Sequence, residues 1–274
     1  MSADGQPTRA QSGAAATSRP EYGNWVSTRF VVAPAVTAVV LVVLAVAAQV
    51  LGIPWLPVAL LGLAVVASLV CAYFAYARRL LAAGDGALQA RVQGLVFERL
   101  SWDGRGRALD IGCGNGPLSI ALAERFPQAR VTGIDFWGES WEYSRDVCES
   151  NAASRGLSER VSFRQASAAA LPFADGSYGA VVSNLCFHEV RGVRDKREVV
   201  KEALRVLEPG GAFAFQDLFR QKSGFGEIDD LQAAVRSWGV SSVEYVDTGR
   251  SEFIPGALRL PFMVGSMGIL HGRK

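Results

Sequence analysis

The sequence has 274 residues, of which 50% are hydrophobic and 20% are charged, with a formal net charge of +2. The charge is unevenly distributed, because the 48 residues from Phe30 to Ala77 contain no Asp, Glu, Lys or Arg. As one helix this stretch would be about 72 Å long, roughly twice the hydrocarbon thickness of a bilayer. These values exclude a soluble single domain as a description of the whole chain.

The charge-free stretch divides into two apolar runs. Phe30–Leu51 and Val58–Ala77 are each long enough to cross a bilayer as a helix. Between them stand two prolines, which resist helix, and a tryptophan, which suits a membrane interface, in the sequence Gly52-Ile53-Pro54-Trp55-Leu56-Pro57. The sequence therefore predicts two transmembrane helices in a tight hairpin over residues 29–79. A pair of buried core helices in a soluble protein is the alternative interpretation.

Arginines flank the hairpin, and its turn carries none. Arg29 precedes the first run and Arg78, Arg79 and Arg91 follow the second. Positive charge near membrane spans favours the cytoplasmic side. This predicts a multi-pass protein of the cell membrane with its N-terminus and the following domain in the cytoplasm. A signal peptide is the alternative for the first run, but a polar leader of nearly 30 residues precedes it, and the second run would still return the chain to the cytoplasm.

The segments on either side of the hairpin differ in composition. Residues 1–28 are rich in Ala, Ser, Gly and Gln, which predicts a disordered segment. Residues 78–274 carry 25 basic and 24 acidic side chains, a balance that argues against a nucleic-acid-binding protein. The four cysteines have no spacing typical of a metal site, so we expect no metal centre and interpret them as small buried residues: Cys71, Cys113, Cys148 and Cys186.

From about residue 84, short apolar strands alternate with amphipathic helices. The expected strands cover residues 107–111, 130–135, 161–165, 179–184, 211–217, 242–247 and 262–270. The expected helices cover residues 87–100, 117–125, 140–153, 196–207 and 227–238. This order predicts an α/β domain over residues 84–274, with a mostly parallel sheet covered on both faces. Ligands of such sheets bind beyond the carboxyl ends of the strands.

A glycine-rich turn follows the first expected strand of this domain, in the sequence Asp110-Ile111-Gly112-Cys113-Gly114-Asn115-Gly116-Pro117. Glycines permit a tight turn and the close approach of a ligand, and Pro117 suits the first turn of a helix. Asp135 comes 19 residues after Gly116, at the end of the second strand, where a carboxylate can accept hydrogen bonds from both hydroxyls of a ribose. A dinucleotide-binding fingerprint would place the third glycine one residue later, where Pro117 stands.

The pattern Asp-x-Gly-x-Gly-x-Gly with a later acid resembles motif I of the class I S-adenosylmethionine-dependent methyltransferases. Three further segments resemble that family in the right order: residues 170–173, 178–184 and 205–211. The resemblance covers about residues 90–274 and is nearest to the small-molecule group that includes quinone and sterol methyltransferases. It implies a Rossmann-like, doubly wound sheet of seven strands, mostly parallel with an antiparallel last strand, and S-adenosyl-L-methionine as the cofactor.

The resemblance also implies which residues bind the cofactor. Gly112 and Gly114 would pass its methionine part, with Asp110 near the amino end of that part. Gly116 is also expected to bind the cofactor. Asp135 would hold the ribose.

Five more positions are candidate site residues. Phe136 would pack on the adenine, and Ser167 stands where the family often has an acid that meets the adenine amino group. Asn184 would line the cofactor pocket. His188 is expected where the substrate pocket opens, as a general base or substrate contact, with a structural histidine as the alternative. Asp217 is expected either to face the substrate or to cap a loop.

The sequence as a whole predicts methyl transfer to a small, lipophilic or membrane-associated acceptor at the cytoplasmic face. The hairpin would hold the enzyme beside acceptors dissolved in the membrane. Trp137, Trp141 and Tyr143 would wall the adenine or the substrate, with packing as the alternative. Two other functions stay open: a non-catalytic membrane scaffold that binds S-adenosylmethionine, and a nicotinamide-dependent oxidoreductase, which the glycine spacing disfavours.

Overall fold

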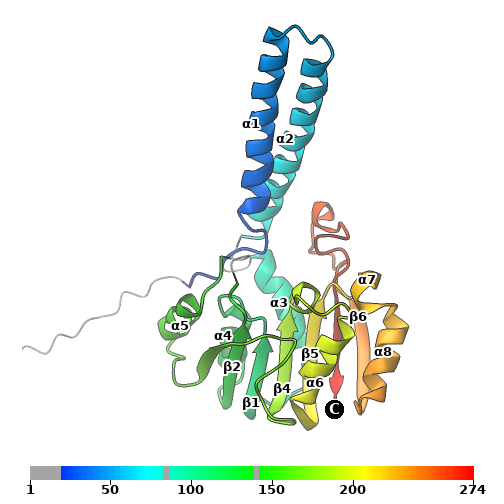
Figure 1. Cartoon of the computed structure of the whole chain (residues 1–274). Helices are drawn as coiled ribbons and strands as arrows, with labels where there is room; N and C mark the ends of the chain where they lie inside the picture. The colour runs from blue at the N-terminus through cyan, green and yellow to red at the C-terminus, as the bar shows by residue number, and fades with distance from the viewer. Residues whose placement is uncertain (1–19, 83–86, 139–141) are drawn as a thin grey trace, which may run out of the picture.

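The computed structural model describes residues 20–82, 87–138 and 142–274 (Figure 1). Two long helices, α1 (Arg29–Val50) and α2 (Leu56–Leu80), stand together and project from an α/β domain. The domain contains one seven-stranded sheet with helices on both faces. The predicted fold class, an apolar helical hairpin followed by a doubly wound α/β domain, is confirmed.

The hairpin is apolar over most of its surface. The helices are joined by a short turn at which Gly52 has a φ of 71°, a value that suits glycine. At the other end of the hairpin, the rings of Phe30 and Phe74 stack with their centroids 5.4 Å apart. Both helices are long and apolar enough to cross a membrane, and only 6% of the most apolar window of each is buried. The low burial argues against core helices of a soluble protein, which bury their apolar side chains.

Residues 20–28 form an ordered segment, which we name the N-terminal strap. Asn24 forms an antiparallel bridge with Ala82, and Val26 is 3% exposed. The prediction of disorder over residues 1–28 is therefore wrong for the strap, and residues 1–19 lie outside the described residues. Composition missed the strap because a few large side chains in a polar segment are enough to pack it.

The sheet has the strand order β3-β2-β1-β4-β5-β7-β6, in which β1 to β5 are parallel to one another and β7 is antiparallel to both β5 and β6. This agrees with the antiparallel last strand that we expected. The strands are β1 (Gly106–Ile111), β2 (Ala129–Asp135), β3 (Val161–Gln165), β4 (Tyr178–Asn184), β5 (Leu207–Asp217), β6 (Ser242–Asp247) and β7 (Gly268–Arg273). The order reverses between β1 and β4, so the carboxyl ends of these two strands border the crevice in which such folds bind ligands.

Helices cover the two faces of the sheet with separate apolar clusters. Adjacent strand residues alternate between the clusters: Ala108 packs on the face covered by α3, α4 and α5, and Leu109 on the face covered by α6 and α8. Both faces are buried, which explains the nearly continuous apolar strands in the sequence. The helices are α3 (Leu88–Arg99), α4 (Pro117–Arg125), α5 (Arg145–Ser154), α6 (Arg197–Arg205) and α8 (Ile228–Ser237).

A third apolar cluster, the junction cluster, attaches the hairpin to the domain. It combines buried side chains from the strap, the end of α2, α3, the residue after β5 and the segment between β6 and β7: Val26, Ala77, Leu81, Val92, Leu218, Ile254, Leu258, Val264 and Met267. The base of the hairpin is therefore packed directly on the domain.

The last strand is the element that the sequence misplaced. We expected it at residues 262–270, but β7 begins at Gly268, and residues 261–266 form consecutive turns instead. The Met263 and Gly265 amides both donate to the carbonyl of Leu260, which bends the chain back on itself. Three short elements were not expected: η1 (Phe187–Glu189), α7 (Lys222–Phe225) and η2 (Gly256–Leu258).

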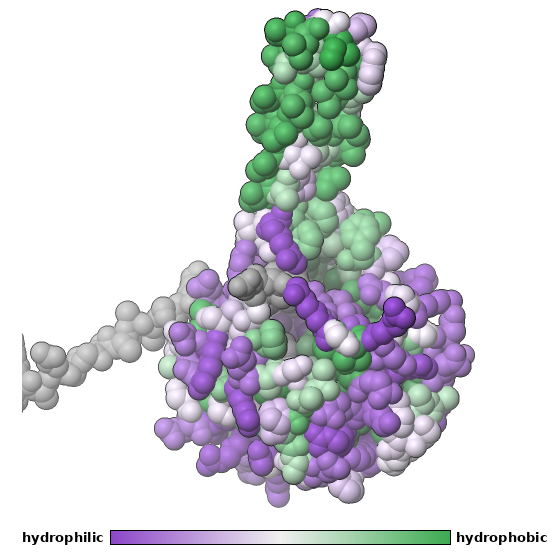
Figure 2. All heavy atoms as spheres, in the orientation of Figure 1, coloured by the Kyte–Doolittle hydropathy of each residue, from purple (hydrophilic) through white to green (hydrophobic). Residues whose placement is uncertain are grey.

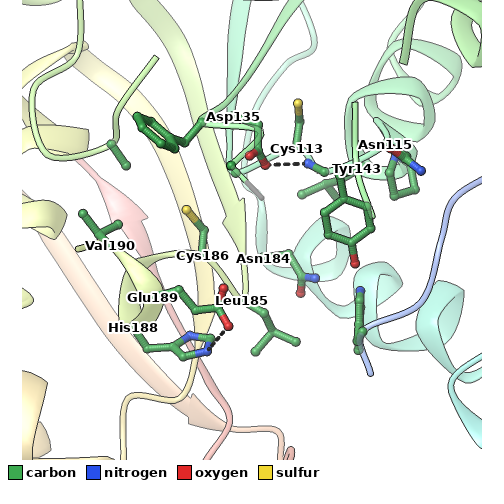
Figure 3. Close-up of a pocket in the computed structure, with 18 of the residues that line it drawn as sticks. Cys113, Asn115, Asp135, Tyr143, Asn184, Leu185, Cys186, His188, Glu189 and Val190 are labelled. Atoms are coloured by element: carbon green, nitrogen blue, oxygen red, sulfur yellow. Dashed lines mark hydrogen bonds and ion pairs between the residues drawn. The ribbon is translucent and has the colours of Figure 1, made fainter. Parts of the chain in front are cut away.

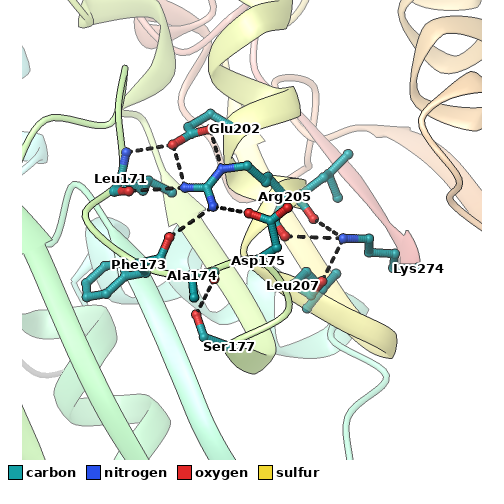
Figure 4. A network of polar contacts seen from close by, with 10 residues as sticks. Leu171, Phe173, Ala174, Asp175, Ser177, Glu202, Arg205, Leu207 and Lys274 are labelled. Atoms are coloured by element: carbon teal, nitrogen blue, oxygen red, sulfur yellow. Dashed lines mark hydrogen bonds and ion pairs between the residues drawn. The ribbon is translucent and has the colours of Figure 1, made fainter.

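Arg205 secures the connection between β3 and β4 (Figure 4). Its guanidinium donates to the carbonyls of Leu171 at 3.1 Å and Phe173 at 2.9 Å, and pairs with the carboxylates of Glu202 and Asp175. This connection begins beside the ligand crevice. The network holds its far end to α6, so the position of the crevice residues does not depend on a free loop.

Candidate active site

A cavity of about 1410 Å³ lies at the carboxyl ends of β1, β2 and β4 (Figure 3). Eight of the nine predicted site residues line it: Asp110, Gly112, Gly114, Asp135, Phe136, Ser167, Asn184 and His188. Gly116 does not line it. That glycine instead precedes the first residue of α4, with a φ of 83° and with no room for a side chain against Phe163. The structure thus gathers residues from four strand ends into one place.

The glycine-rich turn is fixed by its neighbours. The amides of Gly112 and Cys113 both donate to the carbonyl of Ile134, at 2.8 and 3.0 Å, which ties the turn to the end of β2. Gly112 has a φ of 77°, and a Cβ at this position would lie 2.3 Å from the Cβ of Cys186. Only glycine fits here, because the backbone conformation and the space both exclude a side chain.

Asp135 is bonded directly to the turn. Its Oδ2 accepts from the amide of Gly114 and its Oδ1 from the amide of Trp137, both at 2.9 Å, and the Trp137 indole donates to the Gly114 carbonyl. Burial raises the pKa of Asp135, and the amide bonds oppose that shift. The carboxylate at the end of β2 and the turn after β1 thus form one rigid unit (Figure 3).

Asp110 has an unsatisfied oxygen. The side chain is fully buried, and its Oδ2 accepts from the Ser119 hydroxyl at 2.6 Å. Its Oδ1 has no hydrogen-bond partner among the described residues. Burial raises the pKa of Asp110 to about 7, against the bond from Ser119. A buried acceptor without a partner is costly, so this oxygen suits a donor or a cation that enters the cavity.

Phe136, Ser167 and Asn184 line other walls of the cavity. The ring of Phe136 is 66% exposed, which leaves a free aromatic face. The Ser167 hydroxyl accepts from the amide of Ala169 at 3.2 Å, and Asn184 Oδ1 accepts from the Gln216 side chain at 2.8 Å. Each polar side chain is thus held by one bond and still borders the cavity.

His188 forms a pair with Asp217. His188 lies in η1 just after β4, and Asp217 ends the adjacent strand β5; the His188 Nδ1 to Asp217 Oδ1 distance is 2.6 Å. Asp217 also accepts from the amides of Phe187 and Leu218, at 2.6 and 2.7 Å. Of the two roles that the sequence left open for Asp217, it therefore takes that of capping a loop, and it also orients the histidine, but its side chain does not line the cavity.

The pair sets the chemistry of the imidazole. Burial lowers the pKa of His188, but the charge and hydrogen bond of Asp217 and the charge of Glu189 together raise it by more, so the pKa lies above its ordinary value of 6.5. With Nδ1–H donated to Asp217, Nε2 is the nitrogen left to exchange a proton within the cavity. Glu189 Oε1 lies 3.8 Å from Nε2 (Figure 3).

The strap completes the site, which the sequence did not indicate. Asn115 in the glycine-rich turn donates to the carbonyl of Glu21 at 3.1 Å, and the Tyr143 hydroxyl donates to the carbonyl of Asn24 at the same distance. The strap thus lies across the turn that borders the cavity. Tyr143 does line the cavity, as expected, whereas Trp141 lies outside the described residues. Asn115 is part of the glycine-rich turn, but nothing in the sequence indicates that it bonds to Glu21.

Comparison with known proteins indicates the family to which this site belongs. A family described as a methyltransferase domain matches residues 109–215. An O-methyltransferase of Aspergillus nomiae is 31% identical over 170 residues, which cover 56% of this chain and 72% of that protein. A demethylmenaquinone methyltransferase of Thermus thermophilus is 40% identical over 105 residues, 38% of this chain and 44% of the relative. A 27-O-demethylrifamycin SV methyltransferase of Amycolatopsis mediterranei is 34% identical over 142 residues, 52% and 49% respectively.

The match to several curated relatives is partial, since it spans about half of their length. Solved structures share the fold. The [4+2]-cyclase SpnF has a TM-score of 0.51 at 23% identity, covering 67% of this chain and 80% of that one. Geranyl diphosphate C-methyltransferase from Streptomyces coelicolor has a TM-score of 0.52 at 15% identity, covering 68% and 80%. With its glycine-rich turn, its strand order and these relatives, the chain belongs to the class I S-adenosylmethionine-dependent methyltransferases.

Proposed function

We propose that this chain transfers the methyl group of S-adenosylmethionine to a small lipophilic acceptor in the membrane, at the cytoplasmic face. One observation carries the proposal: a single cavity is lined both by the glycine-rich turn and by residues at the base of the α1–α2 hairpin. The names of the relatives, a demethylmenaquinone methyltransferase and a 27-O-demethylrifamycin SV methyltransferase, support a small-molecule acceptor.

The residues present fit the methionine and ribose parts of this cofactor. The unpartnered Oδ1 of Asp110 suits the cationic amino group. Gly112 and Gly114 leave the backbone of the turn open to a ligand, because no side chain covers it. Asp135 would accept from the ribose hydroxyls. Gly116 would support the turn through the start of α4 and would not contact the cofactor.

The adenine would lie toward Phe136. Its exposed ring offers a stacking surface. Ser167 offers a hydroxyl in place of the acid that the family often has at this position, and Asn184 offers an amide. These side chains line the same cavity as Asp135, which is what a continuous binding site for ribose and base requires.

The chemistry asks little of the protein beyond positioning. When bound, the cofactor would supply a methyl group on a positively charged sulfur to the acceptor's nucleophile, and the sulfur would keep the electron pair of the carbon–sulfur bond. Where the acceptor atom carries a proton, His188 Nε2 would take it, and Asp217 would stabilise the imidazolium that results. The chain's own residues would thus orient the two reactants and remove one proton.

The membrane part of the proposal rests on the hairpin. Its exposed surface is almost entirely apolar (Figure 2), and such a surface needs a lipid or protein covering. Arg29, Arg78 and Arg79 lie at the end of the hairpin that meets the domain, and the far turn carries no charge. Positive residues favour the cytoplasmic side, so the strap and the domain would both be cytoplasmic.

Two other functions fit less well. A scaffold that only binds S-adenosylmethionine does not need the His188–Asp217 pair, whose imidazole lines the same cavity as the glycine-rich turn. A nicotinamide-dependent oxidoreductase expects its third glycine one residue later than Gly116. Calorimetry distinguishes the cofactors: we expect S-adenosylmethionine to bind and NAD to give no heat of binding.

The experiment that tests the function incubates the purified full chain with methyl-labelled S-adenosylmethionine and a membrane lipid extract, followed by identification of the labelled product by mass. We expect label in an extractable lipophilic molecule. Asp135→Ala serves as the control that abolishes the product. Label that appears only when water-soluble metabolites replace the lipids would contradict the proposal, and binding without any labelled product would favour the scaffold.

A further inference from the structure

The cavity extends well beyond the space that the cofactor residues border. Besides the glycine-rich turn, its lining includes apolar side chains from three separate segments: Trp25 and Phe30 near the start of the hairpin, Phe74 in α2, and Phe262 and Met263 between β6 and β7. The cavity volume of about 1410 Å³ exceeds the several hundred Å³ that usually hold one small ligand. The apolar part of the cavity therefore offers room for a second molecule of different chemistry.

The segment between β6 and β7 rises beside the base of the hairpin (Figure 1) and contacts it directly. The Tyr73 hydroxyl of α2 donates to the carbonyl of Ala257 at 3.0 Å. The rings of Tyr73 and Phe262 are in edge-on contact, with their centroids 6.2 Å apart. On its other side the segment is held by Arg91, whose guanidinium lies 4.3 Å from the centre of the Phe253 ring. The segment and the hairpin are thus two fixed walls of one opening.

This segment exposes apolar side chains where the domain meets the hairpin. Outside the hairpin, the large hydrophobic side chains exposed by more than about a third, among the described residues, are Phe136, Leu260 and Phe262. Phe136 belongs to the proposed adenine site, and the other two lie on this segment. In Figure 2 apolar atoms continue from the hairpin onto its base, above a mostly polar domain. Exposed apolar patches of this kind mark contacts with a partner or a membrane.

Basic residues at the base of the hairpin indicate where in the bilayer the opening would lie. Arg29 begins α1, and Arg78 and Arg79 end α2, so basic side chains ring the base of the hairpin at the level of Phe30 and Phe74. In a bilayer such residues lie at the phosphate groups. If the hairpin spans the membrane, the apolar opening therefore faces the boundary between headgroups and acyl chains and not bulk water.

We propose that this opening is a lateral portal through which the acceptor enters from the bilayer. The acceptor is an amphiphile whose head passes between the Phe30–Phe74 pair and Phe262 to reach His188, while its apolar tail stays between the portal residues and in the membrane. Leu260 and Phe262 insert into the membrane interface and keep the portal in contact with the lipid. This inference rests on the proposed function and adds the route and the shape of the substrate.

One test of the portal does not depend on turnover. The full chain is placed in nanodiscs with a palmitic-acid analogue that carries a diazirine in its chain, irradiated, and digested for mass spectrometry. We expect adducts on peptides that contain Phe262 and on those that line the cavity near His188, with competition by unlabelled membrane lipid extract. Adducts confined to the lipid-facing middle of α1 and α2 would overturn the portal.

The second test uses a variant. Phe262→Asp is expected to lower the initial rate of methyl transfer to vesicles of membrane lipid extract by roughly tenfold, equivalent to about 1.4 kcal/mol, with unchanged affinity for S-adenosylmethionine. Ala233→Asp, which adds the same charge on the exposed face of α8, should keep the full rate. An undiminished rate in Phe262→Asp would overturn the portal.

The two tests separate the portal from the function. Portal adducts in a chain that methylates nothing in any extract would support the portal and refute the proposed methyl transfer. Labelled lipid product with no adduct at Phe262 and no effect of Phe262→Asp would refute the portal and leave the methyl transfer standing.

Discussion

The hydrogen bond between His188 and Asp217 joins residues 29 positions apart, and it follows from the sheet. β4 and β5 are parallel neighbours in register, with Asn184 opposite Gln216, so the residues just after both strands meet at one edge. A buried carboxylate that also accepts two backbone amides is fixed in place, and it fixes the histidine in turn. The imidazole is therefore oriented before any substrate arrives.

The pH dependence of turnover tests the role of His188. A general base must be deprotonated, so kcat should rise with pH through a midpoint above 6.5, the ordinary value, and then level off. His188→Gln should lower kcat by about 100-fold and remove this acidic limb. Asp217→Asn should move the midpoint down, because the charge that raises the pKa is lost while burial remains. A flat profile in the unsubstituted chain would contradict a base at this position.

Two glycines with similar backbone conformations make a matched pair. Gly112 and Gly106 both have positive φ, but a Cβ at Gly112 would collide with Cys186, and one at Gly106 meets nothing within 4 Å. Gly106→Ala should cost about 1–2 kcal/mol of stability and leave cofactor binding intact. Gly112→Ala should cost more and abolish binding of S-adenosylmethionine. Thermal unfolding and calorimetry measure both effects, and equal losses in the two variants would show that the collision is unimportant.

Asp110 links the stability of the cofactor-free chain to pH. Its folded pKa is about 7 and its ordinary value 3.8, so between these values the folded state holds a proton that the unfolded state has lost. Stability should therefore fall as the pH rises across this window, by an amount on the order of a few kcal/mol. The Asp110→Asn side chain does not ionise, so as the pH rises through this window the melting temperature of the variant should increase relative to that of the unsubstituted chain. The variant should nevertheless bind S-adenosylmethionine more weakly. A constant difference in melting temperature would contradict the raised pKa.

At the scale of elements, the strap connects the hairpin to the glycine-rich turn. Arg78 at the end of α2 donates to the carbonyl of Val26 and pairs with Glu142 at 3.4 Å, and Asn24 in turn donates to the Arg78 carbonyl at 2.8 Å. Strap, hairpin and turn therefore share one set of hydrogen bonds. A movement of the hairpin base would therefore be transmitted through these hydrogen bonds to the proposed cofactor site.

Hydrogen exchange tests this connection. Arg78→Ala removes the side-chain bonds to Val26 and Glu142, so amides of residues 24–28 should exchange faster by about tenfold, a local loss of about 1.4 kcal/mol. Arg79→Ala is the matched control, because Arg79 is the exposed neighbour. Equal exchange rates in the two variants would show that the strap is held by other contacts.

Elements with a regular apolar period were predictable, and those held by tertiary contacts were not. α4 occupies the expected residues 117–125, and β3 and β6 also match. The last strand was predicted too early in the sequence because the apolar run before Gly268 has the pattern of a strand. In the structure this run forms turns that pack in the junction cluster. Eight of the nine predicted site residues line one cavity, because motif residues of this kind lie at strand ends. The strap contacts and the pairing of His188 with Asp217 were missed, since both join segments far apart in the sequence.

At the scale of the whole molecule, two parts of opposite character share one cavity. The hairpin exposes valine and leucine along its length, and the domain is nearly neutral with a polar surface (Figure 2). The junction cluster packs one on the other, so the site has a fixed position relative to the hairpin. In our account this arrangement brings a water-soluble methyl donor and a membrane-dissolved acceptor to the same histidine from opposite sides.

The most direct test of this account adds labelled S-adenosylmethionine, which does not cross lipid, to sealed membrane vesicles of both orientations that contain the full chain. We predict that inverted vesicles, whose cytoplasmic face is outside, incorporate label into extractable lipid, and that right-side-out vesicles do so only after they are permeabilised. Asp135→Ala should incorporate none in either. Labelling of lipid by intact right-side-out vesicles alone, or label found only in water-soluble products, would contradict the account.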